Sequence, residues 1–477
     1  MRKFFSAILS FWLSCGALAA DYYIDYTGGD DSNAGTSTGA AWQYCPGMTA
    51  FTGSYSHSAG DRFIFKGGET WPMSPSSNFT ISYSGTSGNI DTYTSDESWY
   101  TGGSWSRPTL DGQEGFTGAE PMIYASSKSY FTIEKIRFID TGLGDLTTFE
   151  GGRPVDFRDC SDWLIDNCYF DVHGYHSIVA SVVAGNRGAW AITNSTFTNS
   201  SNSIEASVTN PYSVASFTLT GNTFFDPHDS LRNSDHGDGI HLFGSGEFTE
   251  VEIGNNKWYG DFSGSDANTT NQAMIYLENS VVASADIHHN DMSFSNTSHP
   301  RTGNYLFQGF MVLSGADLTV RSNTMNAQAI STSTETARCA IRLSGTTDVA
   351  DIRDNIMVGC RFGIEITVTN STTSQTVAGN TTSNRNLFYD NTNDVAVWTT
   401  YYTVSGWNAA YGEDGDSVED DPDFVDPPDD HSLLVTSPAI GAGTGGIDIG
   451  AYQYDSGGGS SGSITATTVN AGSVIVN

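Results

Sequence analysis

Basic residues are scarce in this sequence. Twenty Lys and Arg stand against 54 Asp and Glu, which gives a formal net charge of −34. Nonspecific nucleic-acid binding needs cations against phosphate, so the composition argues against nucleic acid as a partner. The acidic excess either serves solubility or includes carboxylates that hold Ca²⁺, which would also let an acidic protein bind an acidic polymer.

Long apolar stretches are missing beyond the N-terminus. No later segment approaches the ~20 apolar residues that a membrane helix needs. At the start, Arg2 and Lys3 precede an apolar run over residues 4–13, and Ala17-Leu18-Ala19 has the pattern of a small-residue cleavage site. We therefore expect residues 1–20 to be a secretory signal peptide, and the mature protein to be secreted, without a membrane anchor and monomeric.

No CxxC motif occurs, which argues against a zinc–thiolate site. Five of the six cysteines follow residue 20. Export permits disulfides. Cys160 with Cys168, and Cys339 with Cys360, are candidate pairs, and the odd count leaves one thiol free.

An internal repeat runs through the middle of the chain. Each copy is an alternating apolar strand, an asparagine, a small or polar residue, and a bulky apolar residue. Asn222, Asn256, Asn290, Asn323 and Asn355 carry it at intervals of 34, 34, 33 and 32 residues. Earlier copies are assigned to Asn167 and, with serine in place of asparagine, to Ser195, and Gly379-Asn380 is a weaker copy.

The repeat and the composition together predict the fold class. Asparagine tolerates the left-handed conformation that a tight turn requires, and stacked asparagines can bond to one another along an axis. The 52 glycines and 12% aromatic residues are typical of an all-β protein with many turns. A leucine ladder and the longer units of a propeller are both missing. We predict an all-β, single-stranded right-handed parallel β-helix, a solenoid of stacked coils.

The two ends of the chain differ from the middle. Residues 21–71 and 84–112 at one end, and 421–452 at the other, resemble the opening and closing segments of the pectate-lyase-like superfamily of secreted carbohydrate-active β-helix proteins. The resemblance implies an N-terminal cap, a C-terminal closing segment and one helix domain over residues 21–455. Residues 456–477 are a Gly/Ser-rich linker and a C-terminal stub.

A column of side chains is predicted on one face of the solenoid. The strand preceding each asparagine turn can be aligned by its apolar pairs, such as Ile240/Leu242 and Ile275/Leu277, and the residue between each pair then points outward. The outward residues are Glu205, His241, Tyr276, Val312, Arg342 and Glu365. Glu205, His241 and Tyr276 are candidates for function, whereas Arg342 and Glu365 either bind substrate or simply pair with each other.

The densest group of chemically active residues is the segment Asp226–His241, which holds four aspartates and three histidines. Its first residues, Asp226-Pro227-His228-Asp229, resemble the signature of alginate C5-epimerases, which are β-helix proteins acting on uronate polymers. The resemblance implies that Asp226, His228 and Asp229 are catalytic. The alternative is a solvated turn built on Asp238-Gly239.

Epimerases and lyases both remove the C5 proton of a uronate, which requires carboxylate neutralisation, a base and, for lyases, an acid. Ca²⁺ on Asp235 and Asp238, or Arg232 or Arg342, is the candidate for neutralisation. His241 or His228 is the candidate base and Tyr276 the candidate acid. Glu205, Arg232, Arg342 and Glu365 are candidates for substrate binding.

The main prediction is therefore a polysaccharide lyase or epimerase that acts on an acidic polysaccharide. A glycoside hydrolase is the first alternative, with two carboxylates drawn from Glu205, Asp235, Asp238 and Glu278. A noncatalytic adhesin or polysaccharide-binding solenoid is the second, with Trp258, Tyr259 and Tyr276 as stacking platforms. No phosphate-binding glycine motif and no nucleophilic-serine motif occurs in a credible context.

Overall fold

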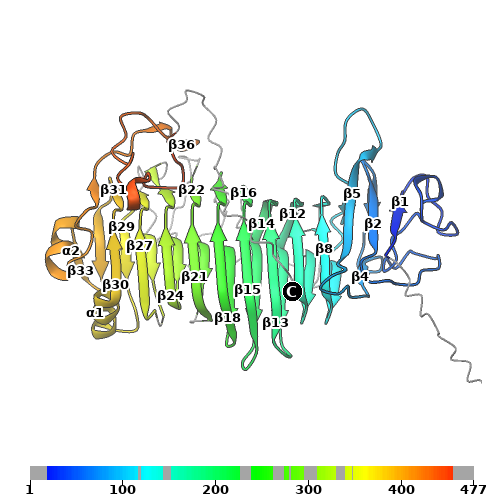
Figure 1. Cartoon of the computed structure of the whole chain (residues 1–477), viewed down its shortest axis with the longest axis horizontal. Helices are drawn as coiled ribbons and strands as arrows, with labels where there is room; N and C mark the ends of the chain where they lie inside the picture. Colours follow the sequence, from blue (N-terminus) through cyan, green and yellow to red (C-terminus); the bar gives the residue numbers. More distant parts are fainter. Residues whose placement is uncertain are drawn as a thin grey trace, which may run out of the picture.

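The computed structural model describes residues 19–116, 120–142, 152–225, 238–260, 273–278, 281–294, 309–328, 339–345 and 347–454, apart from the side chains of residues 173–175 and 201. Almost all regular structure in these ranges is parallel β-sheet, and the coils stack along one long axis (Figure 1). The chain is a right-handed parallel β-helix, which confirms the predicted fold class. Each coil contributes one strand to each of three sheets.

The first sheet has strands in the order of the sequence, each paired in parallel with the next. Its strands are β1 (Asp21–Ile24), β2 (Arg62–Gly67), β5 (Asp91–Tyr100), β8 (Ser129–Glu134), β11 (Ser161–Asp166), β13 (Arg187–Thr193), β15 (Ser213–Thr220), β18 (Glu247–Gly254), β21 (Val282–His288), β24 (Gly315–Arg321), β27 (Val349–Arg353) and β30 (Thr381–Asn384).

The second sheet carries the predicted column. Its strands are β4 (Phe79–Ile81), β7 (Pro121–Ser126), β10 (Arg153–Arg158), β12 (Tyr169–Val182), β14 (Thr196–Val208), β17 (Asp238–Gly244), β20 (Ala273–Leu277), β23 (Gly309–Leu313), β26 (Cys339–Leu343), β29 (Phe362–Ile366) and β32 (Asn393–Val397).

The third sheet is made of short strands and joins the second through the long strands β12 and β14, which run through both. Its other strands are β3 (Thr70–Pro72), β6 (Thr109–Asp111), β9 (Arg137–Ile139), β16 (Thr223–Phe225), β19 (Lys257–Tyr259), β22 (Asp291–Ser293), β25 (Thr324–Asn326), β28 (Ile356–Val358), β31 (Leu387–Tyr389) and β34 (Val418–Glu419).

Aligned side chains fill the interior coil by coil. In the third sheet, Phe138, Phe170, Phe197, Phe224 and Trp258 form one continuous stack with ring centroids 4.6–5.1 Å apart. These residues are at most 1% exposed. The spacing matches the distance between neighbouring strands, so each ring stacks on its equivalent in the next coil. Trp258 is therefore a core residue, and its predicted role as an exposed stacking platform is wrong.

The repeat asparagines form a buried ladder between the first and third sheets. The ladder asparagines are Asn222, Asn256, Asn290, Asn323, Asn355 and Asn386, all at most 1% exposed. The backbone N–H of each of the first five donates to Oδ1 of the next, at 2.9–3.1 Å. Each Nδ2 donates to a carbonyl of the first sheet, as Asn290 Nδ2 does to Ile253 O at 2.8 Å. The predicted bonding along the axis is confirmed.

The left-handed residue of each turn is the one before the ladder position, not the asparagine itself. Positive φ occurs at Asn194, Gly221, Asn255, His289 and Ser322, each followed by a ladder residue. Asn167 also has a positive φ of 51°. The ladder position in its coil belongs to Cys168, whose N–H donates to Ser195 Oγ.

Two further details of the repeat are corrected. Asn380 ends helix α1 (Ser371–Asn380) and is not a turn copy, since Asn386 holds the ladder position in that coil. The strand directly before each ladder asparagine lies in the first sheet, whereas the column strands of the second sheet come one strand earlier in the chain. The alternation of apolar residues is alike in both strands, which is why sequence alone did not separate them.

The predicted disulfides are not formed, because all five cysteines among the described residues are free and buried. Cys160 and Cys168 lie at opposite ends of β11, and a strand of that length separates them by roughly 20 Å. A disulfide requires Cα atoms within about 7 Å. Cys339 pairs with Phe362 of the next coil, so Cys360 lies two residues out of register with it.

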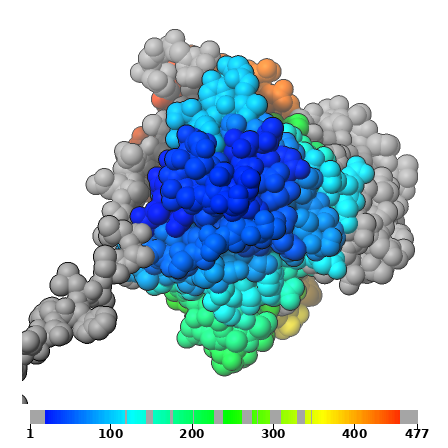
Figure 2. All heavy atoms as spheres, turned by 90° about the vertical axis from the view of Figure 1, so that its right-hand side faces the viewer, coloured from blue at the N-terminus to red at the C-terminus, as the bar shows by residue number. Residues whose placement is uncertain are grey.

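Both ends of the solenoid are covered. The N-terminal residues, including the short helix η1 (Thr38–Ala40), spread across one end of the stack (Figure 2). At the other end, β33 (Thr400–Tyr402) pairs antiparallel with β32, next to α2 (Val404–Tyr411). Among the described residues no helix is both long and apolar enough to span a membrane.

The closing segment, residues 421–454, folds back over the third sheet (Figure 1). It contains the hairpin of β35 (Phe424–Asp426) with β36 (Asp430–Leu433) and the short helix η3 (Thr444–Gly446). A buried polar group anchors it: His431 Nδ1 lies 2.6 Å from Asp291 Oδ1, and Tyr452 OH donates to Asp291 Oδ2 at 2.6 Å. Asp291 and His431 are at most 1% exposed.

Candidate functional site

The predicted column exists with the predicted register. Consecutive backbone partners in the second sheet are Glu205, His241, Tyr276, Val312, Arg342 and Glu365. The same position continues in the N-terminal direction through Val179 to Asp156. Adjacent members lie one strand spacing apart, about 4.8 Å. The column is therefore a strip of titratable groups along the helix axis.

His241 and Tyr276 form the centre of the column. Their rings stack with centroids 4.9 Å apart and an interplanar angle of 14°. Burial raises the pKa of Tyr276, and the nearby Glu278 and Asp238 raise it further, to about 12. Tyr276 is therefore a neutral phenol at physiological pH and can donate a proton or a hydrogen bond.

Two carboxylates flank the His241 ring. Nε2 lies 3.0 Å from Glu278 Oε2, and Nδ1 lies 3.8 Å from Asp238 Oδ2. The Glu278 side chain is 30% exposed, whereas that of Asp238 is fully buried. A histidine with a carboxylate at each nitrogen is held in orientation, and the exposed carboxylate is the one that can move aside for a ligand.

Asp238 also has a structural role. Its Oδ1 accepts the backbone N–H of Ala273 in the next coil at 2.9 Å, just as Asn202 Oδ1 accepts the N–H of Asp238 at 2.7 Å. These bonds repeat the principle of the asparagine ladder at the start of the second-sheet strands. They fix the position of β17 against β20, and so the stacking of His241 on Tyr276.

Glu205 pairs with a histidine that the sequence analysis did not identify. His176 Nε2 forms a short hydrogen bond with Glu205 Oε2. Burial raises the pKa of Glu205, but the attraction of His176, together with its hydrogen bond, lowers it more. With smaller contributions from His241 and Arg153, the pKa of Glu205 falls to about 2. Glu205 is thus an anion over the whole physiological range.

The far end of the column is more enclosed than predicted. Val312 is 5% exposed and Glu365 is 2% exposed. Glu365 Oε2 lies 3.9 Å from Arg342 Nε, and its Oε1 accepts a hydrogen bond from Thr367 Oγ1 at 3.0 Å. The predicted pairing of Arg342 with Glu365 is therefore present. Glu365 is therefore less accessible to a ligand than Arg342, whose side chain is 17% exposed.

A local excess of positive charge lies at the N-terminal end of the column. The buried Asp156 carboxylate is paired with both Arg153, at 3.3 Å, and Arg158, at 3.0 Å. Two guanidinium groups on one carboxylate leave one net positive charge, in a chain whose formal charge is −34. The Arg158 side chain is 50% exposed. It is therefore accessible to an anionic ligand.

Several predicted site residues lie outside the described residues: Asp226, His228, Asp229, Arg232 and Asp235. Their catalytic, substrate-binding and metal-binding roles stay predictions. Within the described ranges no three His, Cys, Asp or Glu side chains are grouped as a metal site requires. The predicted calcium site therefore depends on Asp235, with Asp238 as its described member.

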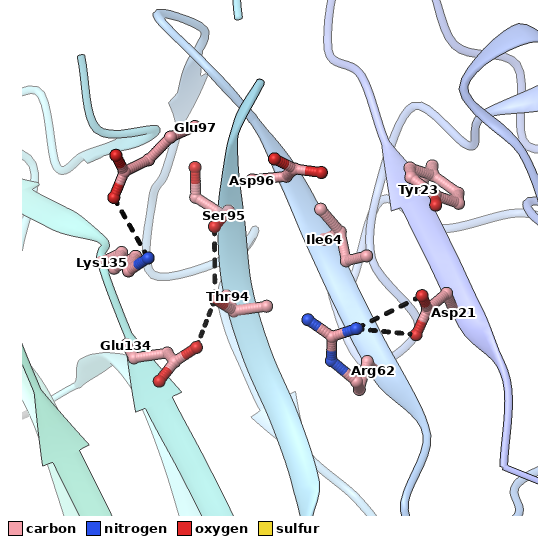
Figure 3. A pocket seen from close by; sticks show the side chains of 10 residues that line it. All are labelled: Asp21, Tyr23, Arg62, Ile64, Thr94, Ser95, Asp96, Glu97, Glu134 and Lys135. Carbon is pink, nitrogen blue, oxygen red and sulfur yellow. Dashed lines mark hydrogen bonds and ion pairs between the residues drawn. The ribbon is translucent and has the colours of Figure 1, made fainter. Parts of the chain in front are cut away.

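A polar groove of about 380 Å³ lies elsewhere, on the outer face of the first sheet near the N-terminus (Figure 3). Both of its cations are already paired: Arg62 with Asp21 at 3.1 Å, and Lys135 with Glu97 at 3.2 Å. Thr94 Oγ1 donates to Glu134 at 2.6 Å. The groove and the column occupy different sheets. We place the candidate site at the column, where stacked and strongly perturbed groups converge.

Comparison with known proteins gives neighbours only among solved structures. No protein-family model matches the chain, and no curated protein is significantly similar to it. The pectate lyase Pel9A is 15% identical, with a TM-score of 0.47 over 92% of this chain and 97% of that chain. A PL6 family polysaccharide lyase from Pseudopedobacter saltans is 12% identical, with a TM-score of 0.41 over 83% and 95%.

A GH136 lacto-N-biosidase from Eubacterium ramulus is 10% identical, with a TM-score of 0.39 over 72% of this chain and 64% of that chain. Likeness at this level gives no information about the function of this chain. The function therefore has to be argued from the column itself.

Proposed function

We propose that this protein is a secreted enzyme that removes the C5 proton of uronate residues in an acidic polysaccharide, with elimination as the outcome. The observation that carries the proposal is the stacked pair of His241 and Tyr276 in adjacent coils. It places a candidate base and a neutral proton donor on one face, with their ring centroids 4.9 Å apart. An elimination needs both groups next to neighbouring atoms of a single sugar.

In this reaction Glu278 moves aside, and His241 reacts as the neutral tautomer with its hydrogen on Nδ1, facing Asp238, so that the lone pair of Nε2 accepts the C5 proton. Asp238, near Nδ1, keeps the ring in orientation. The C5–H electron pair forms the C4–C5 double bond, the bond from C4 to the glycosidic oxygen breaks, and Tyr276 OH protonates the leaving oxygen. The pKa of Tyr276, about 12 because of burial and the nearby Glu278 and Asp238, suits a group that must hold its proton until the transition state.

The substrate carboxylate must be neutralised for its C5 proton to become acidic. Arg342 lies two strands beyond Tyr276 in the column, roughly 10 Å away at the backbone, and its charge lowers the pKa of Tyr276. Arg342, which also pairs with Glu365 in the next coil, is therefore the described cation on the Tyr276 side of the stacked pair. Arg158 and Arg153 supply a second positive region for a neighbouring sugar of the polymer. Calcium on Asp235 and Asp238 is the alternative neutralising group.

Hydrolysis is the competing function, because Glu205 and Glu278 flank the stacked pair. The strands of these carboxylates are two coils apart, roughly 10 Å, near the upper end of the separation found in inverting glycosidases. Glu205, with a pKa of about 2 because the pull of His176 outweighs burial, would have to be the base. Glu278 would then be the acid.

Product analysis on a panel of polyuronates tests the proposal. We expect products with the ultraviolet absorbance of an unsaturated uronate, and Tyr276→Phe should lower the rate about 10²–10⁴-fold. Tyr100→Phe, at the exposed end of β5 in the first sheet, is the matched control and should keep full activity. New reducing ends without that absorbance would contradict the proposal and indicate hydrolysis instead. A parallel assay with EDTA decides whether calcium takes part.

A further inference from the structure

Ala20 is held in the fold by both of its backbone polar groups. Its nitrogen lies 2.9 Å from Asp61 Oδ1, and its carbonyl accepts the N–H of Arg62 at 2.9 Å. The next residue, Asp21, opens β1 and pairs with Arg62 in the first sheet. Ala20 therefore extends the first strand, so the predicted signal peptide, residues 1–20, includes one residue that belongs to the fold.

Asp61 is a buried carboxylate that lacks a cationic side chain among the described residues. It is 0% exposed, and its Oδ2 accepts hydrogen bonds from Tyr55 OH at 2.7 Å and Ser58 N at 2.9 Å. The two basic residues nearest to Asp61 in the sequence pair with other carboxylates: His57 with Asp91, and Arg62 with Asp21. A buried anion without a counter-charge is costly, so the cap lacks one positive charge at this position.

We propose that the exported chain begins at Ala20 and that its new α-amino group forms an ion pair with Asp61. Hydrolysis of the Ala19–Ala20 peptide bond consumes one water and leaves a carboxylate on Ala19. The amino group freed on Ala20 takes up a proton and becomes an ammonium group. Ala19 is exposed. The small-residue pattern Ala17-Leu18-Ala19 ends at this bond.

Processing then changes the energetics of the N-terminal cap. Before cleavage, Asp61 receives an ordinary amide hydrogen bond from Ala20. After cleavage the same oxygen receives a charge-assisted bond from a cation, which is about twice as strong. The cap covers the open end of the solenoid (Figure 2). The finished cap is therefore a property of the mature protein and not of the precursor.

The pair has a defined pH signature. An ammonium group beside a buried carboxylate has a folded pKa above its unfolded value of about 7.7–8.0. Its contribution to stability is complete below that value and is lost as the pH rises through the folded pKa. The other titratable groups facing Asp61 are Tyr22, Tyr55, Tyr93 and the Asp91–His57 pair.

These neighbours do not produce the same signature. Burial is the main cause that raises the pKa of all three tyrosines above the ordinary value of 10, and Asp61 adds to the increase in each, after Cys45 and Asp91 in the case of Tyr93. The tyrosines therefore keep their protons near pH 7, where the two chains are compared. The His57–Asp91 pair is identical in chains that differ only at the N-terminus. A difference between two such chains therefore reports the new amino group alone.

Two measurements test the proposal. The intact mass of the exported protein should correspond to a chain that starts at Ala20. A chain starting at Ala20 should melt about 1 °C higher than one starting at Ala19 near pH 7, and the difference should vanish by about pH 10. Asp61→Asn should abolish the difference, whereas Asp21→Asn, at an exposed ion pair, should leave it intact.

A mature mass that starts at Asp21 or elsewhere would overturn the proposal. So would equal melting temperatures for the two chains at every pH. If Asp61→Asn fails to fold, the comparison of the chains that start at Ala20 and Ala19 still tests the proposal, because neither chain carries a substitution.

Discussion

Replacement of Asn290 by alanine should destabilise the solenoid strongly, although no ligand or catalytic group is touched. Asn290 is fully buried, and its Oδ1 accepts both the backbone N–H and the Nδ2 of Asn256, at 3.1 and 3.0 Å. Its Nδ2 donates to Asn323 Oδ1 at 2.9 Å and to Ile253 O at 2.8 Å. Asparagine at this position therefore links three successive coils.

The size of the stability loss depends on which hydrogen-bond partners of Asn290 keep another hydrogen bond in the alanine variant. Asn256 Nδ2 retains Leu219 O, and Asn323 Oδ1 retains the backbone N–H of Asn290. The backbone N–H of Asn256 loses its side-chain acceptor and is left buried, which costs about 1–3 kcal/mol. With the cavity and the remaining lost bonds, we expect a loss of about 2–4 kcal/mol in the free energy of unfolding.

Denaturant unfolding of the purified variants measures this loss. Asn380→Ala is the matched control, since that exposed side chain makes one hydrogen bond of 3.4 Å, and it should stay within about 0.5 kcal/mol of the parent. Asn290→Ser should recover part of the loss, because Ser195 already fills a ladder position with its hydroxyl as the acceptor. An Asn290→Ala protein no less stable than the control would refute the ladder as a stabilising element.

Three further predictions concern other parts of the molecule. Asp291→Asn should cost about 3–5 kcal/mol and expose the closing segment to proteolysis, because it breaks a buried bond to His431; a variant that resists protease like the parent would contradict this. Glu205→Gln should lower stability by about 1–3 kcal/mol at pH 7. Burial raises the pKa of Glu205, but pairing with His176 outweighs it and lowers the pKa from 4.5 to about 2. The stability difference between Glu205→Gln and the parent should therefore fade as the pH drops through that interval. A stability difference that does not change with pH would argue against the pair. Burial raises the pKa of Cys160 to about 11 and that of Cys168 to about 12, so alkylation of these thiols at pH 8 should require unfolding. A reductant should leave the melting temperature unchanged, because neither thiol is in a disulfide. Rapid labelling of the folded protein would contradict this prediction.

The column was predictable from sequence because β-strand periodicity is rigid. Apolar pairs such as Ile240/Leu242 must face the core, so the residue between them has to point outward. Parallel register between coils then places these outward residues in one column. His241 and Tyr276 were placed in adjacent coils on this reasoning alone, and the backbone pairing agrees.

Other features were not predictable because their cause is not local. The left-handed turn position accepts Asn, Gly, His, Ser, Asp and Arg in different coils, so it leaves no sequence pattern. His176 was missed because the pairing of β12 with β14 shifts register between Asp171 and Gly174, which breaks the alternation that the alignment needs. Glu278 is a candidate carboxylate in the sequence, but its contact with His241 was not predictable, because it lies just beyond the end of β20, where the strand pattern no longer fixes the direction of a side chain.

The central claim is that the column breaks the C5–H bond of a uronate. A polyuronate labelled with deuterium at C5 tests it directly, since elimination and epimerisation both release the label to solvent. We predict release by the parent and by His289→Asn, a control in the turn after β21, and none by His241→Ala. Shortening of the polymer with the label fully retained would contradict the claim.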